Sequence, residues 1–286
     1  MTETMQLSTV DYISQLQANA PPDVLTLDLS MAYEEQRKYV CVKIPPDIGP
    51  TIELIMLTDV QWGAMACVKS RYKEYLNWIL AVPNRFVFFG GDMINSGTLL
   101  SKATPFEDEG HPLGQIYQFC EVTMPIRHRV LGYVGGNHER HTRPTLGRSA
   151  GSLIASVLRI PYSDGQQYID IYYGPWKPFK VTLWHGSGSA QTAGAKMQKL
   201  VRFMSEGDSH LYLMGHLHDC MVKPHWRVQR DVKGRKIGLQ KYYGCMSSSF
   251  MEFWGTYAEA MGLTPTDTVM ARCVLEANGH WEVTVR

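Results

Sequence analysis

Five short apolar runs recur along the chain, and each of them ends in a residue that can bind a metal ion. The runs are 53–59, 85–92, 129–137, 179–186 and 210–216. They are rich in β-branched or aromatic residues and nearly free of polar ones, which is typical of strands buried on both faces. Segments with helical periodicity lie among them, at 66–80, 112–123, 149–158 and 191–205. This alternation predicts a layered α/β fold.

Beyond residue 220 the pattern changes to strands and turns, with one short helix-like stretch, WGTYAEAMG. The whole pattern favours two mixed sheets packed face to face, with helices outside. The first 24 residues are polar and predict an N-terminal extension, and residues 25–286 predict a single domain. A content of 44% hydrophobic and 19% charged residues in 286 excludes a disordered or low-complexity protein.

The net charge and the cysteines indicate which kinds of partner and which cellular compartment to expect. The net charge is +1, so any site for a polyanion must be local. No apolar run approaches the roughly 20 residues that span a bilayer, and the N-terminus lacks the basic start of a signal peptide. We therefore expect a cytoplasmic protein with no membrane partner. The six scattered cysteines, without a C-x-x-C pair, predict buried free thiols.

The ends of the five runs carry related chemistry. They read Asp59-Val60-Gln61, Gly90-Gly91-Asp92, Gly136-Asn137-His138-Glu139, His185-Gly186 and Gly215-His216-Leu217-His218. Each motif alone is weak, because a strand-terminal Asp often caps a helix and G-N-H is often a turn. Ligands of α/β sheets bind outside the carboxyl ends of the strands, where all five motifs are expected. Carboxylate, imidazole and amide donors together suit Mn, Fe or Zn better than Ca or Mg.

The order D-x-[H/Q], G-D, G-N-H-E, H-G, G-H-x-H, over residues 57–218, resembles the signature of calcineurin-like metallophosphoesterases. The segment 247–267 also resembles the end of phosphoesterases encoded by bacteriophages, which would make the compartment a host cytoplasm. The resemblance implies a four-layer α/β/β/α sandwich of two mixed sheets with a two-metal site. Its cofactors would be two divalent ions, with Mn preferred and Fe or Zn as alternatives.

The resemblance also implies which residues bind the metals. One ion would be held by Asp59, Gln61, Asp92 and His218. The second would be held by Asp92, Asn137, His185 and His216, so that Asp92 bridges the two. His138 would lie beside the metals and contact the phosphate.

Such a site hydrolyses phosphate esters, since two divalent ions can clamp phosphate oxygens and lower the pKa of a bridging water. The resulting hydroxide would attack phosphorus, with Asp92 and His138 as the catalytic residues. His138 would either donate a proton to the leaving oxygen or neutralise the developing charge. The sequence leaves both roles open.

Two positions depart from the family pattern. Gln61 stands where most members have His, which predicts a weaker or more open first metal. Asn95 stands where many members have an Asp that orients the G-N-H histidine. Glu139 or Asp108 could take over that role.

Basic residues suggest where a substrate could bind. A predicted hairpin at about 223–241 carries seven Lys and Arg against one Asp, and it follows the metal-binding histidines. It is either a basic lip for nucleic acid or a solvated hairpin. Arg140 and Arg143 follow a ligand turn closely enough to reach a bound phosphate.

Three functions remain open at this point. The first is a phosphodiesterase or nuclease acting on DNA or a nucleotide. The second is a phosphomonoesterase acting on a phosphoprotein or small metabolite. The third is a catalytically weak binding protein on the same fold, which only Gln61 and Asn95 support. The sequence does not fix the oligomeric state.

Overall fold

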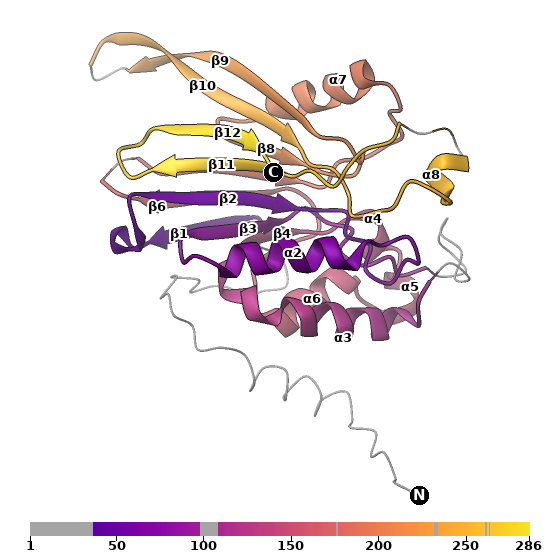
Figure 1. Cartoon of the computed structure of the whole chain (residues 1–286). Helices are drawn as coiled ribbons and strands as arrows, with labels where there is room; N and C mark the ends of the chain where they lie inside the picture. The colour runs from indigo at the N-terminus through magenta and orange to yellow at the C-terminus, as the bar shows by residue number, and fades with distance from the viewer. Residues whose placement is uncertain (1–36, 98–107, 176, 232–233, 261, 263) are drawn as a thin grey trace, which may run out of the picture.

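The computed structural model describes residues 37–97, 108–175, 177–231, 234–260, 262 and 264–286. Over these residues the chain forms two six-stranded sheets packed face to face, with helices on their outer faces (Figure 1). This arrangement is the four-layer α/β/β/α sandwich of two mixed sheets that the sequence predicted. The predicted extension 1–24 lies outside the described residues.

The first sheet has the strand order β12-β11-β2-β3-β4-β5. Its strands are β2 (Thr51–Leu57), β3 (Arg85–Phe89), β4 (Val130–Val134), β5 (Tyr162–Ser163), β11 (Ala271–Glu276) and β12 (Trp281–Val285). Strands β2 to β5 are parallel, and β11 and β12 are antiparallel to their neighbours. Ile55 and Leu57 of β2 pack against helices, whereas Leu54 and Met56 pack against the second sheet. Burial on both faces explains the unbroken apolar runs.

The second sheet has the order β1-β6-β7-β8-β10-β9. Its strands are β1 (Tyr39–Ile44), β6 (Gln167–Tyr173), β7 (Phe179–Trp184), β8 (Leu211–Met214), β9 (Met221–Asp231) and β10 (Lys236–Met246). Strands β7, β8 and β10 run parallel, and β9 pairs antiparallel with β10. The basic segment at 223–241 therefore falls on the β9–β10 hairpin, which extends beyond the body of the molecule (Figure 1).

Four longer helices cover the sheets. They are α2 (Lys69–Leu80), α3 (Pro112–Thr123) and α6 (Ala150–Leu158) on the first sheet, and α7 (Ala193–Met204) on the second. Short helices occupy connections: η1 (Pro46–Ile48), η3 (Met124–Arg129), α4 (Asn137–Arg140), α5 (Arg143–Leu146) and α8 (Tyr257–Ala260). Among the described residues, no helix combines the length and apolarity that a bilayer span requires.

The cysteines agree only in part with the predicted buried thiols. All six are free, and Cys120, Cys245 and Cys273 are buried in the core. Cys41, in contrast, is exposed on edge strand β1. Its side chain points outward because β1 alternates exposed and buried residues.

A half-buried histidine at the entrance to β8 links stability to pH. The His210 ring stacks on Phe179 with centroids 5.3 Å apart, and its Nδ1 accepts a hydrogen bond from the Lys180 backbone N–H at 3.0 Å. Burial, together with the charges of Lys180 and Arg227, lowers the pKa of His210 from 6.5 to about 4, although Asp208 and Asp170 oppose this shift.

The free energy of unfolding should therefore fall as the pH drops from 6.5 to 4. The unfolded chain takes up a proton at His210 in this window and the folded chain does not, so stability is complete above it. The loss should approach about 3 kcal/mol, at 1.36 kcal/mol per pKa unit. Denaturant titration at a series of pH values measures this loss. His210→Asn, which can still accept from Lys180, should flatten the slope, whereas His280→Asn in the exposed β11–β12 turn should not.

Candidate metal centre

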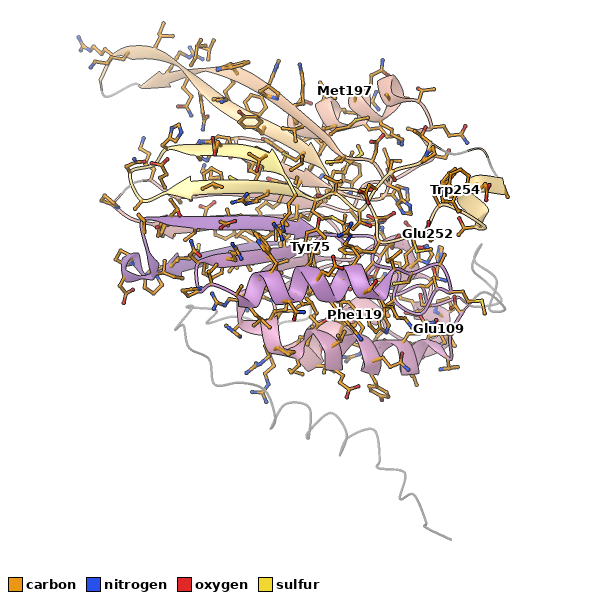
Figure 2. The ribbon with its side chains drawn as sticks, in the orientation of Figure 1. Tyr75, Glu109, Phe119, Met197, Glu252 and Trp254 are labelled. Atoms are coloured by element: carbon orange, nitrogen blue, oxygen red, sulfur yellow. The ribbon has the colours of Figure 1, made fainter. Side chains whose placement is uncertain are left out.

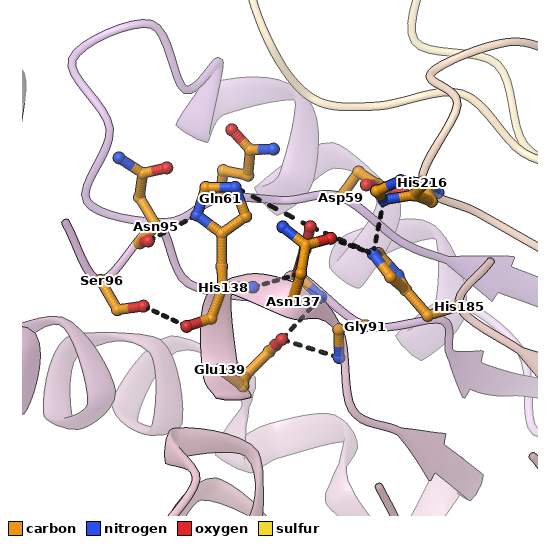
Figure 3. Close-up of polar contacts among 12 residues, drawn as sticks. Asp59, Gln61, Gly91, Asn95, Ser96, Asn137, His138, Glu139, His185 and His216 are labelled. Atoms are coloured by element: carbon orange, nitrogen blue, oxygen red, sulfur yellow. Dashed lines mark hydrogen bonds and ion pairs between the residues drawn. The ribbon is translucent and has the colours of Figure 1, made fainter. Parts of the chain in front are cut away.

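The side chains of the five motifs meet at one end of the two sheets. Asp59 and Gln61 follow β2, Asp92 follows β3, and Asn137 and His138 follow β4. His185 follows β7, and His216 and His218 follow β8. The strands that carry them belong to both sheets, so the centre lies where the two layers end together (Figure 3).

Backbone conformation distinguishes these positions from ordinary loops. Asp59, Gln61, Asp92, His216 and His218 all have positive φ, between 46° and 70°. Positive φ is uncommon outside glycine and costs about 1 kcal/mol or more for each residue. Residues with strained backbone conformations are concentrated at functional sites. There the strained conformation points the side chain in a direction that a relaxed loop would not give it.

One group of donor atoms converges on His185. Its Nε2 lies 3.1 Å from Asp92 Oδ2, 3.2 Å from Asn137 Oδ1 and 3.2 Å from His216 Nδ1. Ligand atoms of Asp92, His185 and His216 all lie within 4.8 Å of one another. We call these four residues the second ligand group, because they are the set expected for the second metal.

The remaining predicted ligands form a separate cluster, the first ligand group. Asp59 Oδ1 lies 3.1 Å from His218 Nε2, and Gln61 Nε2 lies 3.5 Å from the same nitrogen. The other oxygen of Asp59 accepts hydrogen bonds from Thr58 Oγ1 at 2.6 Å and from the His216 N–H at 2.8 Å. Asp59 thereby connects the two clusters through the backbone of His216.

Backbone carbonyls determine which nitrogen of each imidazole faces the centre. His185 Nδ1 lies 2.8 Å from Gly90 O, and His216 Nε2 lies 2.8 Å from Gly188 O. Because a carbonyl can only accept, each of these nitrogens must carry the proton. His185 Nε2 and His216 Nδ1 then face the centre, where a metal ion could bind them in place of any proton, an arrangement common among histidine ligands.

The charges at the centre are strongly coupled. Burial alone would raise the pKa of Asp92, but the charges of His185 and His138 hold the pKa of this carboxyl below its ordinary value. Burial alone would lower the pKa of His185, but the neighbouring Asp92 carboxylate raises it to about 9. The buried carboxylates thus require positive charge beside them, which is a condition for binding a cation.

Glu139 has a role that the motif did not reveal. Its Oε2 accepts from the N–H groups of Asp92 and Gly136, both at 2.9 Å, and its Oε1 accepts from the Met93 N–H at 2.6 Å and Tyr133 Oη at 3.0 Å. The side chain is fully buried. It therefore ties the turn after β3 to the turn after β4 and does not orient His138. In the sequence, only the position of Glu139 directly after His138 indicated that it belongs to the site.

His138 is oriented by a backbone group. Its Nδ1 donates to Asn95 O at 2.6 Å, and its Nε2 lies 3.9 Å from Asp92 Oδ2. Asp108 does not contact His138 and instead accepts from the Asn95 side-chain amide, from the Gly97 N–H at 2.6 Å and from Gln115 at 2.9 Å. The expectation that Glu139 or Asp108 would replace the missing Asp is therefore wrong, because the carbonyl of Asn95 itself takes that position.

The two arginines that follow the turn already have partners within the chain. Arg140 donates from Nε to Gly136 O at 3.0 Å, and Arg143 forms an ion pair with Asp164. The Arg143 side chain is half exposed. Both stay beside the β4 turn, and their predicted contact with substrate phosphate remains a prediction.

The basic hairpin does not surround the centre. Arg227 of β9 donates to the carbonyls of Gly207 and Ser209, which precede β8, whereas His216 follows β8. The end of β9 at Asp231 and the start of β10 at Lys236 thus lie toward the opposite end of the sheet from the ligands (Figure 1). The interpretation of this segment as a basic lip of the metal centre is therefore wrong, because β9 runs away from its ligands.

Comparison with known proteins finds distant similarity to solved structures. No family model matches the chain, and no curated protein matches it. Among solved structures, a nuclease MPE from Pseudomonas putida is 16% identical, with a TM-score of 0.34, over 78% of this chain and 84% of that one. A protein serine/threonine phosphatase from Saccharomyces cerevisiae, similar to human phosphatase PP5, is 10% identical, with a TM-score of 0.36, over 96% and 87%.

A 5'-nucleotidase from Candida albicans is 11% identical, with a TM-score of 0.34, over 82% of this chain and 50% of that one. The layered fold follows from the chain's own strand order. Its two mixed sheets between helical layers, with the five motifs at one end of their strands, agree with the arrangement that the sequence predicted.

Replacing Glu139 by Gln should weaken metal binding by about 10- to 100-fold, the usual effect of losing a group that supports the ligands. Gln offers one acceptor oxygen, and its NH₂ would face the N–H donors that the carboxylate now accepts. Calorimetric titration with Mn²⁺ measures the change. Glu74→Gln, at an exposed carboxylate on α2, is the matched control. Equal affinity in both variants would show that the two turns hold their positions without Glu139.

Proposed function

We propose that this chain is a two-metal phosphoesterase, and more specifically a phosphodiesterase that acts on nucleic acid or a nucleotide. The observation that carries the proposal is the convergence of donor atoms from both sheets in two adjacent clusters. Backbone carbonyls hold the other nitrogen of each ring, so that His185 Nε2 and His216 Nδ1 face the centre.

The residues fit divalent ions of the first transition row. The first ligand group with Asp92 would hold one ion, and the second ligand group would hold the other. Imidazole, carboxylate and amide donors suit Mn, Fe or Zn, and the amides of Gln61 and Asn137 favour Mn. His185 Nε2 has two oxygens and one nitrogen within 3.2 Å, a cluster of donor atoms in which a metal ion would take the place of the proton on Nε2.

When bound, two such ions would withdraw charge from phosphate oxygens and make water acidic enough to act as a nucleophile. The residues of the chain supply orientation and proton control. Asp92 is buried and anionic, so it can lie between two cations, whereas a neutral side chain would leave them repelling. His138 donates from Nδ1 to Asn95 O, so only its Nε2 is available to a phosphate oxygen or leaving group.

An exposed aromatic side chain at the same end of the molecule as the ligand residues supports a nucleotide substrate. The Phe250 N–H donates to Asp59 O at 3.1 Å, and the Glu252 N–H donates to Ala66 O at 2.8 Å. Trp254 follows shortly after and is 70% exposed, while Met65 on the adjoining turn is 67% exposed. Trp254 lies at the end of the molecule where α4 carries ligand residues (Figures 1 and 2). An exposed indole here could stack on a base.

Metal-free protein reconstituted with Mn²⁺ should cleave bis-p-nitrophenyl phosphate and single-stranded DNA faster than p-nitrophenyl phosphate. The three assays are run in parallel at equal enzyme concentration. A preference for the monoester would overturn the diesterase proposal in favour of a phosphomonoesterase. Inactivity on all three substrates, with Mn²⁺ bound, would favour a binding protein on this fold.

Two variants separate metal binding from chemistry. Asp92→Asn should abolish turnover, because it removes the anion expected between the metals. His138→Ala should slow turnover by about 10²- to 10⁴-fold, as expected for loss of a group that acts on a proton, with metal content unchanged. Metal content is measured by inductively coupled plasma mass spectrometry. Loss of metal from His138→Ala would instead make His138 a ligand.

Trp254→Ala should raise the KM for single-stranded DNA roughly fivefold or more, since stacking on one base contributes about 1–3 kcal/mol. Trp226→Ala is the matched control, because Trp226 is 53% exposed on the hairpin that leads away from the centre. Steady-state kinetics on one oligonucleotide measures both variants. Equal KM values would remove Trp254 from the substrate site.

A further inference from the structure

The β9–β10 hairpin carries an apolar stripe on one face. Trp226, Val228, Ile237 and Leu239 are 53%, 66%, 78% and 71% exposed, respectively. The register pairs Val228 with Leu239, and the other two lie two residues away on each strand, so all four side chains share a face. Adjacent exposed side chains of this size mark a surface that binds a partner.

The stripe continues the face that is buried in the body of the protein. Tyr243 and Cys245, on the same face of β10, pack between the two sheets. Strand β9 is also the last strand of its sheet among the described residues. An edge strand presents backbone N–H and C=O groups that can pair with an added strand. The hairpin therefore offers both an apolar face and an open edge.

The charge of the hairpin restricts what can cover it. Arg230 and Lys241 lie on the same face as the stripe. Strand segments 221–230 and 236–246 contain no acidic residue. A second hairpin packed face to face would bring like charges together, which is unfavourable. The matching occupant is an extended segment with apolar residues on one face and acidic residues around them.

The chain itself contains such a segment. Residues 24–31 read VLTLDLSM, in which Leu25, Leu27, Leu29 and Met31 alternate with polar residues as in a half-buried strand. Residues 1–36 contain six Asp and Glu and no Lys or Arg. The alternating apolar residues of this segment match the apolar stripe, and the acidic residues of 1–36 match the basic residues of the hairpin.

Chain length prevents this segment from reaching the β9 edge of its own molecule. Strand pairing places Tyr39 of β1 level with Lys223 of β9, at the two opposite edges of one sheet. A strand added outside β9 would lie about 29 Å from β1, at roughly 4.8 Å for each strand step. The six residue-to-residue steps from Met31 to Arg37 span at most about 22 Å. The segment must therefore come from another molecule.

We propose that residues 24–31 of a second copy of this chain add as a strand along β9, with their leucines on the apolar stripe. Reciprocal exchange of the two segments gives a dimer. This interface is independent of the proposed phosphoesterase activity.

The test is the molar mass of full-length protein in solution, measured by light scattering during size-exclusion chromatography. Wild type at high micromolar concentration should give twice the 32.4 kDa of one chain. A hairpin variant, Val228→Asp with Leu239→Asp, should give the monomer mass, and so should a segment variant, Leu27→Asp with Leu29→Asp. Val201→Asp, at a 41% exposed position on α7, should remain dimeric.

A mixture of the two double variants distinguishes the interface from general damage to the fold. One variant keeps an intact hairpin and the other an intact segment, so the equimolar mixture should regain dimer mass through one exchanged strand. Circular dichroism and thermal melting confirm that each variant is folded. The proposal is overturned by a monomeric wild type, by a segment variant that stays dimeric, or by a mixture that stays monomeric.

Discussion

The geometry of the metal centre depends on one buried carboxylate, that of Glu139. Its hydrogen bonds join the turn that carries Asp92 to the turn that carries His138. The turns approach so closely that a Cβ added at Gly91 would lie 2.8 Å from Gly136 N, and one added at Gly136 would overlap Asp92 Oδ1. Burial, together with the charge of Asp92, raises the pKa of Glu139 to about 7, so this anchor costs free energy that its hydrogen bonds offset.

Main-chain carbonyls also determine the orientation of the histidine rings at the centre. The carbonyls of Gly90, Gly188 and Asn95 each accept from one imidazole nitrogen and leave the other nitrogen to the centre. For His138, this means that the replacement of Asp by Asn at position 95 does not leave the ring without an acceptor. The oxygen that orients His138 is therefore neutral, whereas an Asp side chain would supply a charged one.

Much of this arrangement could be predicted because its signals are local. An apolar run followed by Asp92 or His185 specifies both a buried strand and the side chain at its end. The acceptor of His138 could not be predicted, since a backbone carbonyl leaves no mark in the sequence. The direction of the β9–β10 hairpin was also hidden, because it follows from strand order across the whole sheet. The basic segment follows His218 closely in the sequence, which suggested that it lies beside the metal centre. Strand β9 instead leads this segment away from the ligands.

The position of β11 has a consequence for the order of events during synthesis. Strand β2, which carries Asp59 at its end, is paired on one side with β3 and on the other with β11, near the end of the sequence. Tyr75 of α2 similarly donates to the carbonyl of Arg286 at 2.6 Å. Every predicted metal ligand is therefore translated before the sheet that supports the first of them is complete. A ribosome-bound chain that ends before residue 271 would lack a neighbour for β2, and such long-range pairing forms slowly.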